Sequence, residues 1–429
     1  MKRTFLLPAL AIVLNLTVSA AEVPKPDIVV AVDGSGDFKT IQSALDSIPK
    51  TNTERIVVFI KNGVYREKIR VDASCVTLRG ESRTGTQIEF PQDNEDFRKT
   101  PDAIGRAVIN VNQADDFVLD NLFIENTAGI IGPHAFTIFS TGDRGVVVNC
   151  NVWSHGADTV AFWRADRSRS YHANCRFEGS VDFMCPHGWC YATNCAFYEM
   201  KNTAAMWHDG SKDKDMKFVL RDCRFDGADG WNLARHHHDA QFYFLDCRFS
   251  RTMIDRPPYR VIYPLDGGTA STNDIQRNKD LDKSNLWGER SYYDHCHRDG
   301  GDYRWFADNL ATAPGAPKPE QINAAWTFGD MWNPESNAGP VIKHITKGEG
   351  QITVAFSENV TVKGKPRLKL SNGEFADYAS GSGSDTLTFH LPGKPADAVS
   401  VDLNGGFILA SQASAATRMA GLSLPAGRN

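Results

Sequence analysis

A short phrase recurs five times in the middle of the chain: Asn or Asp, then Cys, any residue and an aromatic. Its copies, of which the first has its aromatic one residue late, are Asn149–Trp153, Asn174–Phe177, Asn194–Phe197, Asp222–Phe225 and Asp246–Phe249. Their cysteines lie 20 to 28 residues apart, and each copy follows a short apolar segment. Such a repeat is typical of a solenoid, whose coils bury their apolar edges by stacking on one another. We expect an all-β chain built on a right-handed parallel β-helix, because the signature of leucine-rich repeats is missing.

The chain has nine cysteines, which in an exported protein would ordinarily suggest disulfides. The five repeat cysteines hold equivalent positions on successive coils, so we expect them to stack in the core as free thiols. Cys185 and Cys190 are the pair best placed to close a small loop. With His187 they suggest a metal site, but a fourth ligand is missing, so we predict no metal and no cofactor.

Three polar residues, His134, Asp158 and Asp182, follow one another at intervals of 24 residues, about one coil of the predicted helix. On successive coils they would be neighbours roughly 5 Å apart. Two carboxylates this close cannot both ionise freely, which favours one as an acid and the other as a nucleophile or base. The spacing predicts acid–base chemistry, with a structural ladder of polar residues as the alternative.

The first residues have the three parts of a secretory signal. Lys2 and Arg3 precede an apolar stretch over 5–18, and Val18-Ser19-Ala20 supplies a small-residue cleavage site. Residues 1–20 are therefore predicted to be a signal peptide. No later apolar segment approaches the ~20 residues that span a bilayer, so we expect a periplasmic or secreted protein without membrane insertion.

Further changes in pattern divide the mature chain. Residues 41–48 keep helical spacing and are predicted to cap the open end of the solenoid, which we place at 21–333. A Pro- and Gly-containing linker over 334–340 follows. From 341 to 429, short strands alternate with Gly and Ser turns, which predicts a small β-sandwich.

The charge balance limits the partners. A net charge of −5 gives no reason to expect nucleic-acid binding, and we expect a monomer. Basic side chains gather locally at Arg164, Arg167, Arg169 and along Arg235–His238. They form either a solvated face or a groove for a carboxylate-bearing polymer.

Several motifs, in order over residues 28–332, resemble those of the pectin methylesterases. These are Asp33–Gln42, Gly63–Glu67 (Gly-x-Tyr-x-Glu in the family), Ala157–Val160 (Gln-Asp-Thr-Leu), Gly179–Phe183 (Gly-x-Val-Asp-Phe) and Leu233–His237 (Leu-Gly-Arg-Pro-Trp). The terminal region resembles bacterial immunoglobulin-like modules through Val354–Val360, with much less specificity.

The resemblance implies a parallel β-helix that acts on a pectic polysaccharide without a cofactor. It implies that Asp182 attacks the methyl-ester carbonyl of a galacturonate. Asp158 would give a proton to the departing methanol and later take one from water. Arg235 would orient Asp182 and lower the pKa of its carboxyl.

The chain departs from the family pattern around these residues. His134 and Ala157 replace two glutamines that stabilise the oxyanion, and the loss of one such donor can cost ~3 kcal/mol. His134 is a candidate oxyanion donor or a packing residue. Ala157, Phe183 and His237 are candidate substrate contacts, with His237 in place of a tryptophan that packs on the sugar. Cys185-Pro186 replaces Phe-Gly, so homogalacturonan need not be the best substrate.

Two other functions fit the same sequence. A polysaccharide lyase is one, since lyases also use β-helices, although the chain has no calcium-binding acidic cluster beside Arg235. A catalytically impaired glycan-binding protein is the other, suggested by Ala157 and the appended domain. Fold alone does not separate these functions.

Overall fold

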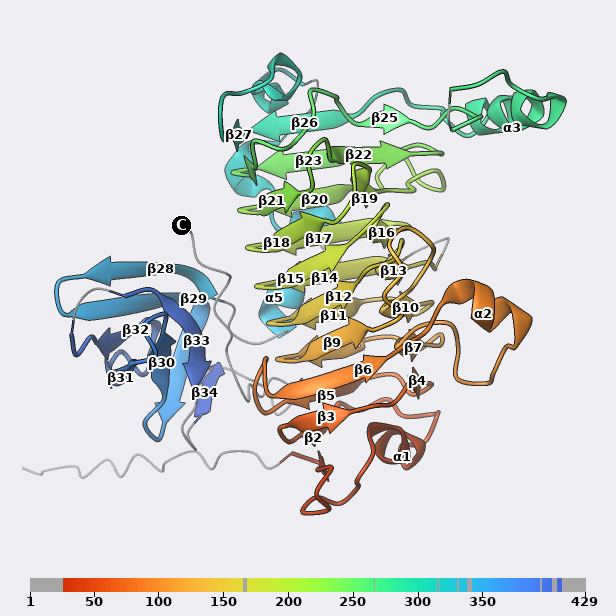
Figure 1. The fold of residues 1–429 in the computed structure, drawn as a ribbon. Coiled ribbons are helices and arrows are strands. Elements are labelled where there is room, and N and C mark those ends of the chain that lie inside the picture. The colour runs from red at the N-terminus through yellow and green to blue at the C-terminus, as the bar shows by residue number, and fades with distance from the viewer. Residues whose placement is uncertain are drawn as a thin grey trace, which may run out of the picture.

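The computed structural model describes residues 26–164, 168–265, 267–313, 315, 317–329, 332–337, 342–393, 396–402 and 407–410. The predicted signal peptide lies outside this part of the chain. Most of the described chain winds into a stack of coils with three parallel sheets, and a separate sheet follows at the C-terminal end (Figure 1). The parallel β-helix prediction is confirmed.

Each complete coil contributes one strand to each of three sheets, which we call A, B and C, and the coils at the two ends contribute fewer. Sheet A contains β1 (Ile28–Val30), β2 (Ile56–Ile60), β5 (Val76–Gly80), β8 (Val118–Asp120), β11 (Gly145–Val148), β14 (Arg169–Ala173), β17 (Trp189–Thr193), β20 (Phe218–Arg221), β23 (Phe242–Leu245) and β26 (Ser291–Asp294). Sheet B contains β3 (Gly63–Tyr65), β6 (Thr86–Phe90), β9 (Phe123–Asn126), β12 (Asn151–Ser154), β15 (Arg176–Gly179), β18 (Ala196–Glu199), β21 (Arg224–Gly227), β24 (Arg248–Phe249) and β27 (His297–Arg298). Sheet C contains β4 (Ile69–Val71), β7 (Ile109–Val111), β10 (Ile138–Ser140), β13 (Val160–Phe162), β16 (Met184–Pro186), β19 (Ala204–Trp207), β22 (Asn232–His236) and β25 (Tyr259–Arg260).

The repeated phrase marks the turn from sheet A into sheet B. Its Asn or Asp has a positive φ in every copy, from 51° at Asn194 to 56° at Asn149. Asn and Asp tolerate this left-handed conformation better than most side chains, which explains why they recur there. In the last four copies the aromatic points inward, and Phe177, Phe197 and Phe225 stack with ring centroids 5.5 and 5.0 Å apart.

The repeat cysteines line the core as predicted. All nine cysteines are free, and the five in the repeat are at most 2% exposed. Cys296 continues the column on the next coil, where the aromatic of the phrase is absent. Cys185 lies on sheet C and Cys190 on sheet A, so the two do not close a loop.

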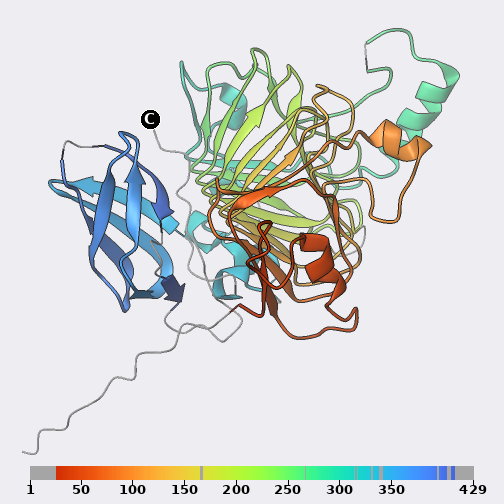
Figure 2. The same ribbon diagram turned by 60° about the horizontal axis from the view of Figure 1, so that its bottom comes forward.

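Helices cover one end and two sides of the solenoid. The predicted capping helix is α1 (Ile41–Asp46), which buries Ile41, Ala44 and Leu45 against the core. Helices α2 (Asn94–Lys99) and α3 (Thr272–Asp282) project together on the side away from the C-terminal sheet (Figures 1 and 2). The segment with η1 (Arg304–Phe306), η2 (Leu310–Thr312), η3 (Pro319–Gln321), α4 (Ala324–Thr327) and α5 (Pro334–Asn337) follows the last coil. Its apolar residues, such as Ile322 and Phe328, pack on the outer face of sheet A.

The C-terminal region forms one curled antiparallel sheet. It contains β28 (Ile342–Gly348), β29 (Gln351–Lys363), β30 (Arg367–Leu370), β31 (Phe375–Ser380), β32 (Ser384–His390), β33 (Ala398–Asp402) and β34 (Phe407–Ala410). The long β29 pairs with β32 mainly along its first half and with β34 along its second, so the sheet curls around its own core. The two layers expected of a small sandwich are thus parts of one sheet, and the immunoglobulin-like assignment is not confirmed.

Two further observations concern the predicted boundaries and the membrane. Residues 334–337 of the expected linker form α5. In the part of the chain that the structure describes, no helix combines the length and apolar character needed to cross a membrane.

Candidate active site

The three evenly spaced residues lie where sheet B turns into sheet C on adjacent coils. His134 precedes β10, Asp158 precedes β13 and Asp182 precedes β16. His134 is bridged to Ala157, one residue before Asp158, so the spacing identifies the neighbouring coils but is one residue out of register. The imidazole still reaches the next residue, with Nε2 of His134 3.3 Å from Oδ2 of Asp158.

The backbone at these turns is in an uncommon conformation. Asp158 has φ 56°, Val181 φ 47° and Asp182 φ 59°. A positive φ is a genuine outlier for a β-branched residue such as Val181, and strain of this kind clusters at functional sites. Backbone bonds hold the turns to each other, from the Asp158 N–H to the Val181 carbonyl at 3.2 Å and from the Asp182 N–H to the Ala204 carbonyl at 2.7 Å.

Arg235 of β22 grips the Asp182 carboxylate with two nitrogens. Its Nε donates to Oδ1 at 2.9 Å and its Nη2 donates to Oδ2 at 2.8 Å. Both side chains are mostly buried, which makes this bidentate pair stronger than an exposed one. The pairing that the motifs implied is present in the structure.

The surroundings of the two carboxyls affect their pKa values differently. Burial, with the adjacent Asp182 charge, raises the pKa of Asp158 well above its usual value. Burial also raises the pKa of Asp182, and Arg235 opposes that rise. The expectation of a lowered Asp182 pKa is therefore wrong in sign, because desolvation outweighs the guanidinium. Asp182 is still the carboxyl that ionises first, since it alone has a bonded cation.

His134 and Ala157 occupy the two altered family positions side by side. The His134 side chain is 50% exposed, and its backbone carbonyl accepts from the N–H of Asn94 in α2 at 3.0 Å. Ala157 is 2% exposed. Burial, followed by the charge of Arg98, lowers the pKa of His134, so the ring is neutral near pH 7.

Aromatic side chains that no motif singled out form one wall beside Arg235. Trp207 meets His237 edge-on at 4.4 Å, and the Tyr263 hydroxyl lies 2.6 Å from Nε2 of His237. Trp163 and Tyr259 pack in the same cluster with buried Cys185. Burial lowers the pKa of His237 to about 4, so this ring is neutral too. The signal for this wall in the sequence is weak, because these aromatics lie on coils and insertions without a shared motif.

Phe183 is not a substrate contact. Its side chain is 0% exposed and belongs to the interior cluster of the solenoid, 6.4 Å from the Phe197 ring. The chain passes through a left-handed turn at Val181 and Asp182, and the residue after Asp182 lies inside the solenoid.

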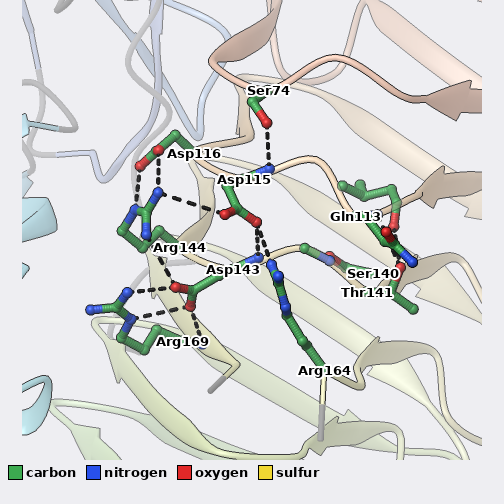
Figure 3. A network of polar contacts seen from close by, with 12 residues as sticks. Ser74, Gln113, Asp115, Asp116, Ser140, Thr141, Asp143, Arg144, Arg164 and Arg169 are labelled. Carbon is green, nitrogen blue, oxygen red and sulfur yellow. Dashed lines mark hydrogen bonds and ion pairs between the residues drawn. The ribbon is translucent and has the colours of Figure 1, made fainter. Parts of the chain in front are cut away.

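Two of the arginines expected to line a groove are already paired with carboxylates. Figure 3 shows Arg164 on Asp115 and Arg169 on Asp143, with Arg144 joining Asp116 and Asp143. This network lies at the turns from sheet C to sheet A, so it does not face Asp182. Arg167 is outside the described residues. Of the arginines predicted to line a groove, Arg235 is thus the one that lies at the candidate site.

The neighbouring histidines bond locally. His236 is buried with Nδ1 2.6 Å from the His238 carbonyl, and His238 has Nδ1 2.6 Å from Oγ of Ser284. Among the described residues, the one group with metal-ligand spacing is Asp294, His295 and Asp308, at the end of sheet A and away from the site. Nothing in its geometry links it to Asp158 or Asp182.

Comparisons with known proteins agree with this fold. The pectinesterase family model matches residues 27–254. A pectinesterase of Petunia integrifolia is 36% identical over 173 residues, covering 40% of this chain and 44% of that protein. The putative pectinesterase/pectinesterase inhibitor 28 of Arabidopsis thaliana is 32% identical over 238 residues, covering 54% of this chain and 31% of that protein. The chain thus spans less than half the length of these two curated relatives.

Solved structures match over a larger share. Pectin methylesterase PemA from Erwinia chrysanthemi aligns with a TM-score of 0.54 and 20% identity, over 72% of this chain and 98% of that one. The carrot pectin methylesterase aligns with a TM-score of 0.51 and 17% identity, over 72% and 95%. These likenesses bear out the right-handed parallel β-helix. Since the family model covers more than half of the residues, the chain belongs to the pectinesterase family.

Proposed function

We propose that the protein hydrolyses methyl esters of galacturonate residues in pectin or a related pectic glycan and releases methanol. One observation carries the proposal: of two buried carboxyls on adjacent coils, only Asp182 is bonded to a guanidinium. This asymmetry supplies one ionised and one protonated carboxyl at the same pH, as ester hydrolysis through an acyl-enzyme requires. The family match supports the same reaction class.

In the first half of the reaction, an Oδ atom of ionised Asp182 attacks the ester carbonyl carbon. The carbonyl π bond opens to an oxyanion, which collapses and breaks the bond to the methoxy oxygen. Protonated Asp158 gives its proton to that oxygen, so methanol leaves as a neutral molecule and an anhydride joins Asp182 to the sugar. Arg235 holds Asp182 in place and stabilises its ionised form.

In the second half, Asp158 is an anion and acts as a base. It takes a proton from water as the water oxygen attacks the acyl carbon of the anhydride, which restores protonated Asp158. Collapse of this intermediate breaks the bond to Asp182 and returns its carboxylate. The galacturonic acid product then loses its proton to solvent, and the net change is ester plus water to carboxylate, methanol and a proton.

His134 serves Asp158 in this scheme. Its Nε2 lies 3.3 Å from Oδ2 of Asp158, and its side chain is half exposed while Asp158 is buried. The imidazole can therefore accept a hydrogen bond from protonated Asp158 and connect it with solvent. An oxyanion contact by the same ring remains a second role for His134.

The wall beside Arg235 suits a sugar ring. Tyr263 and the neutral His237 are partly exposed rings with polar tips, packed against the buried Trp207, and such rings bind carbohydrates and uncharged esters. We further propose action outside the cytoplasm, on the basis of the signal sequence over residues 1–20. The oligomeric state expected, a monomer, stays a prediction.

The test is incubation of the purified protein with highly methylated pectin, with and without a chelator. Free methanol that is insensitive to chelation is the expected result. An unsaturated sugar product would indicate a lyase, and polymer binding without either product would indicate an impaired binding protein. Either outcome would overturn the proposed function.

A further inference from the structure

Glu199, the last residue of β18, has a buried carboxyl beneath the turn that carries Asp182. Its side chain is 0% exposed. One oxygen, Oε1, accepts three hydrogen bonds, from the Val181 N–H at 3.2 Å, the Lys201 N–H at 3.0 Å and the Thr203 hydroxyl at 3.1 Å. The other oxygen, Oε2, is buried without a partner. This division fits a neutral acid, with Oε1 as its carbonyl oxygen.

The hydrogen bond from the Val181 N–H to Glu199 lies at the turn that carries Asp182. Val181 and Asp182 both have positive φ, a conformation that persists only where surrounding contacts impose it. Glu199 binds the N–H of Val181, while the carbonyl of Val181 accepts from the N–H of Asp158. One peptide segment thus connects Glu199 to the backbone of both candidate catalytic carboxyls.

The charge state of Glu199 follows from its surroundings. Burial raises its pKa to about 9, and the nearby Asp182 charge acts in the same direction. The groups that face it from neighbouring segments are Asp182, the Val181 and Lys201 N–H groups and the Thr203 hydroxyl. Near pH 7 Glu199 is therefore neutral, next to the carboxyl that the proposed function takes to be ionised.

We propose that Glu199, in its protonated form, is a positioning residue that fixes the strained Val181–Asp182 turn and so aims the Asp182 carboxylate at the ester. The inference rests on the proposed role of Asp182. Ionisation of Glu199 would place a second negative charge near Asp182, where it opposes the negative charge that develops on the ester oxygen, and this predicts a fall in turnover at alkaline pH.

Substitutions separate this role from general support of the fold. Glu199→Gln keeps a carbonyl oxygen for the three donors and cannot ionise, so we expect kcat near the wild-type value at pH 7 and a weaker alkaline fall. Glu199→Ala removes the anchor, so we expect kcat to drop about 10- to 100-fold with little change in KM, because small misplacements of a reacting group cost this much. Glu178→Gln, on the adjacent coil and paired with Arg176, is the matched control and should leave the pH profile unchanged.

The readouts are methanol release from methylated pectin between pH 6 and 10, thermal unfolding, and carbon-13 NMR titration of labelled aspartate. The NMR arm does not need activity: Glu199→Ala should shift the titration of Asp182, and Glu178→Gln should not. If the wild type releases no methanol, the proposed function fails. The NMR titration still tests whether Glu199 positions Asp182. Folded Glu199→Ala with wild-type kcat or an unchanged Asp182 titration would overturn the inference, as would an alkaline fall that persists in full in Glu199→Gln.

Discussion

Replacing Ala157 by Gln should lower turnover unless His134 is changed as well. The two residues are bridged on adjacent coils, so their side chains stand side by side about 5 Å apart. Ala157 is 2% exposed and leaves the space that the His134 imidazole uses to reach Oδ2 of Asp158. A glutamine at 157 competes for that space.

The expected size follows from these contacts. Forcing extra atoms into a packed site costs about 1–3 kcal/mol, and a hydrogen bond between neutral groups contributes about 0.5–1.5 kcal/mol. If either cost raises the free energy of the transition state by about 1.4 kcal/mol, kcat/KM drops tenfold. We expect losses of about this size in Ala157→Gln and in His134→Gln.

The double variant should recover much of the loss. A glutamine at 134 is slimmer than imidazole, and a glutamine at 157 supplies an amide donor for the oxyanion. The two changes should therefore be non-additive by 1 kcal/mol or more. The wild type, the two single variants and the double variant are compared by methanol release from simple methylated galacturonan and from a native pectic polymer. Ala157→Ser, which adds little volume, is the control, and thermal unfolding checks that each variant folds.

Three outcomes would refute the reasoning. Additivity within about 0.5 kcal/mol would mean that residues 134 and 157 act independently. A rise in turnover for Ala157→Gln alone would mean that the missing donor is a simple deficit. Unchanged kinetics on both substrates would mean that residue 157 does not face the reacting ester.

Three further predictions concern the nucleophile, the C-terminal sheet and buried histidines. Asp182→Asn should lower turnover on the order of 10³-fold or more while the protein stays folded and binds polymer, and substantial residual activity would remove Asp182 from its role. A chain ending at Asn337 should keep turnover on short oligosaccharides, because the C-terminal sheet lies opposite α2 and α3; a folded but inactive truncation would contradict this (Figures 1 and 2). His172 is buried with both ring nitrogens unpartnered and a pKa lowered to about 4, so stability present above pH 6.5 should be lost as pH falls toward 4, by up to about 3 kcal/mol. Urea unfolding at pH 7 and 4.5 should show a smaller loss in His172→Phe than in the wild type or in exposed His344→Gln, and an equal loss would rule out this source.

Much of the solenoid could be predicted from the sequence because one local requirement repeats on every coil. The turn into sheet B needs a left-handed residue, which Asn149 and its equivalents supply, and the next positions point inward, which suits Cys and an aromatic. The pattern is therefore visible without knowledge of distant contacts. Register is harder, since coils differ in length, and this is why His134 pairs with Ala157 rather than with Asp158.

The environment of the site was less accessible to sequence reasoning. The direction of the Asp182 pKa depends on burial, which opposes Arg235 and cannot be read from a motif. The motif makes Phe183 a candidate substrate contact, but the left-handed turn before it and its burial are not visible in the motif. Glu199 carries no motif at all, and its role follows only from the three donors that the fold brings to one oxygen.

The stacked architecture also explains why departures from the family occur together in this chain. A side chain on one coil has its nearest neighbours on the coils above and below, so a larger ring at 134 is compatible with a smaller residue at 157. His237 also shares space with its neighbours. It contacts Trp207 on an adjacent coil and Tyr263 on an insertion. Changes in such a site are expected to be correlated along the stack, because the parallel register fixes which residues share space. We therefore expect a pocket reshaped as a unit around Asp158 and Asp182, while the carboxyls and Arg235 have the arrangement that the proposed chemistry needs.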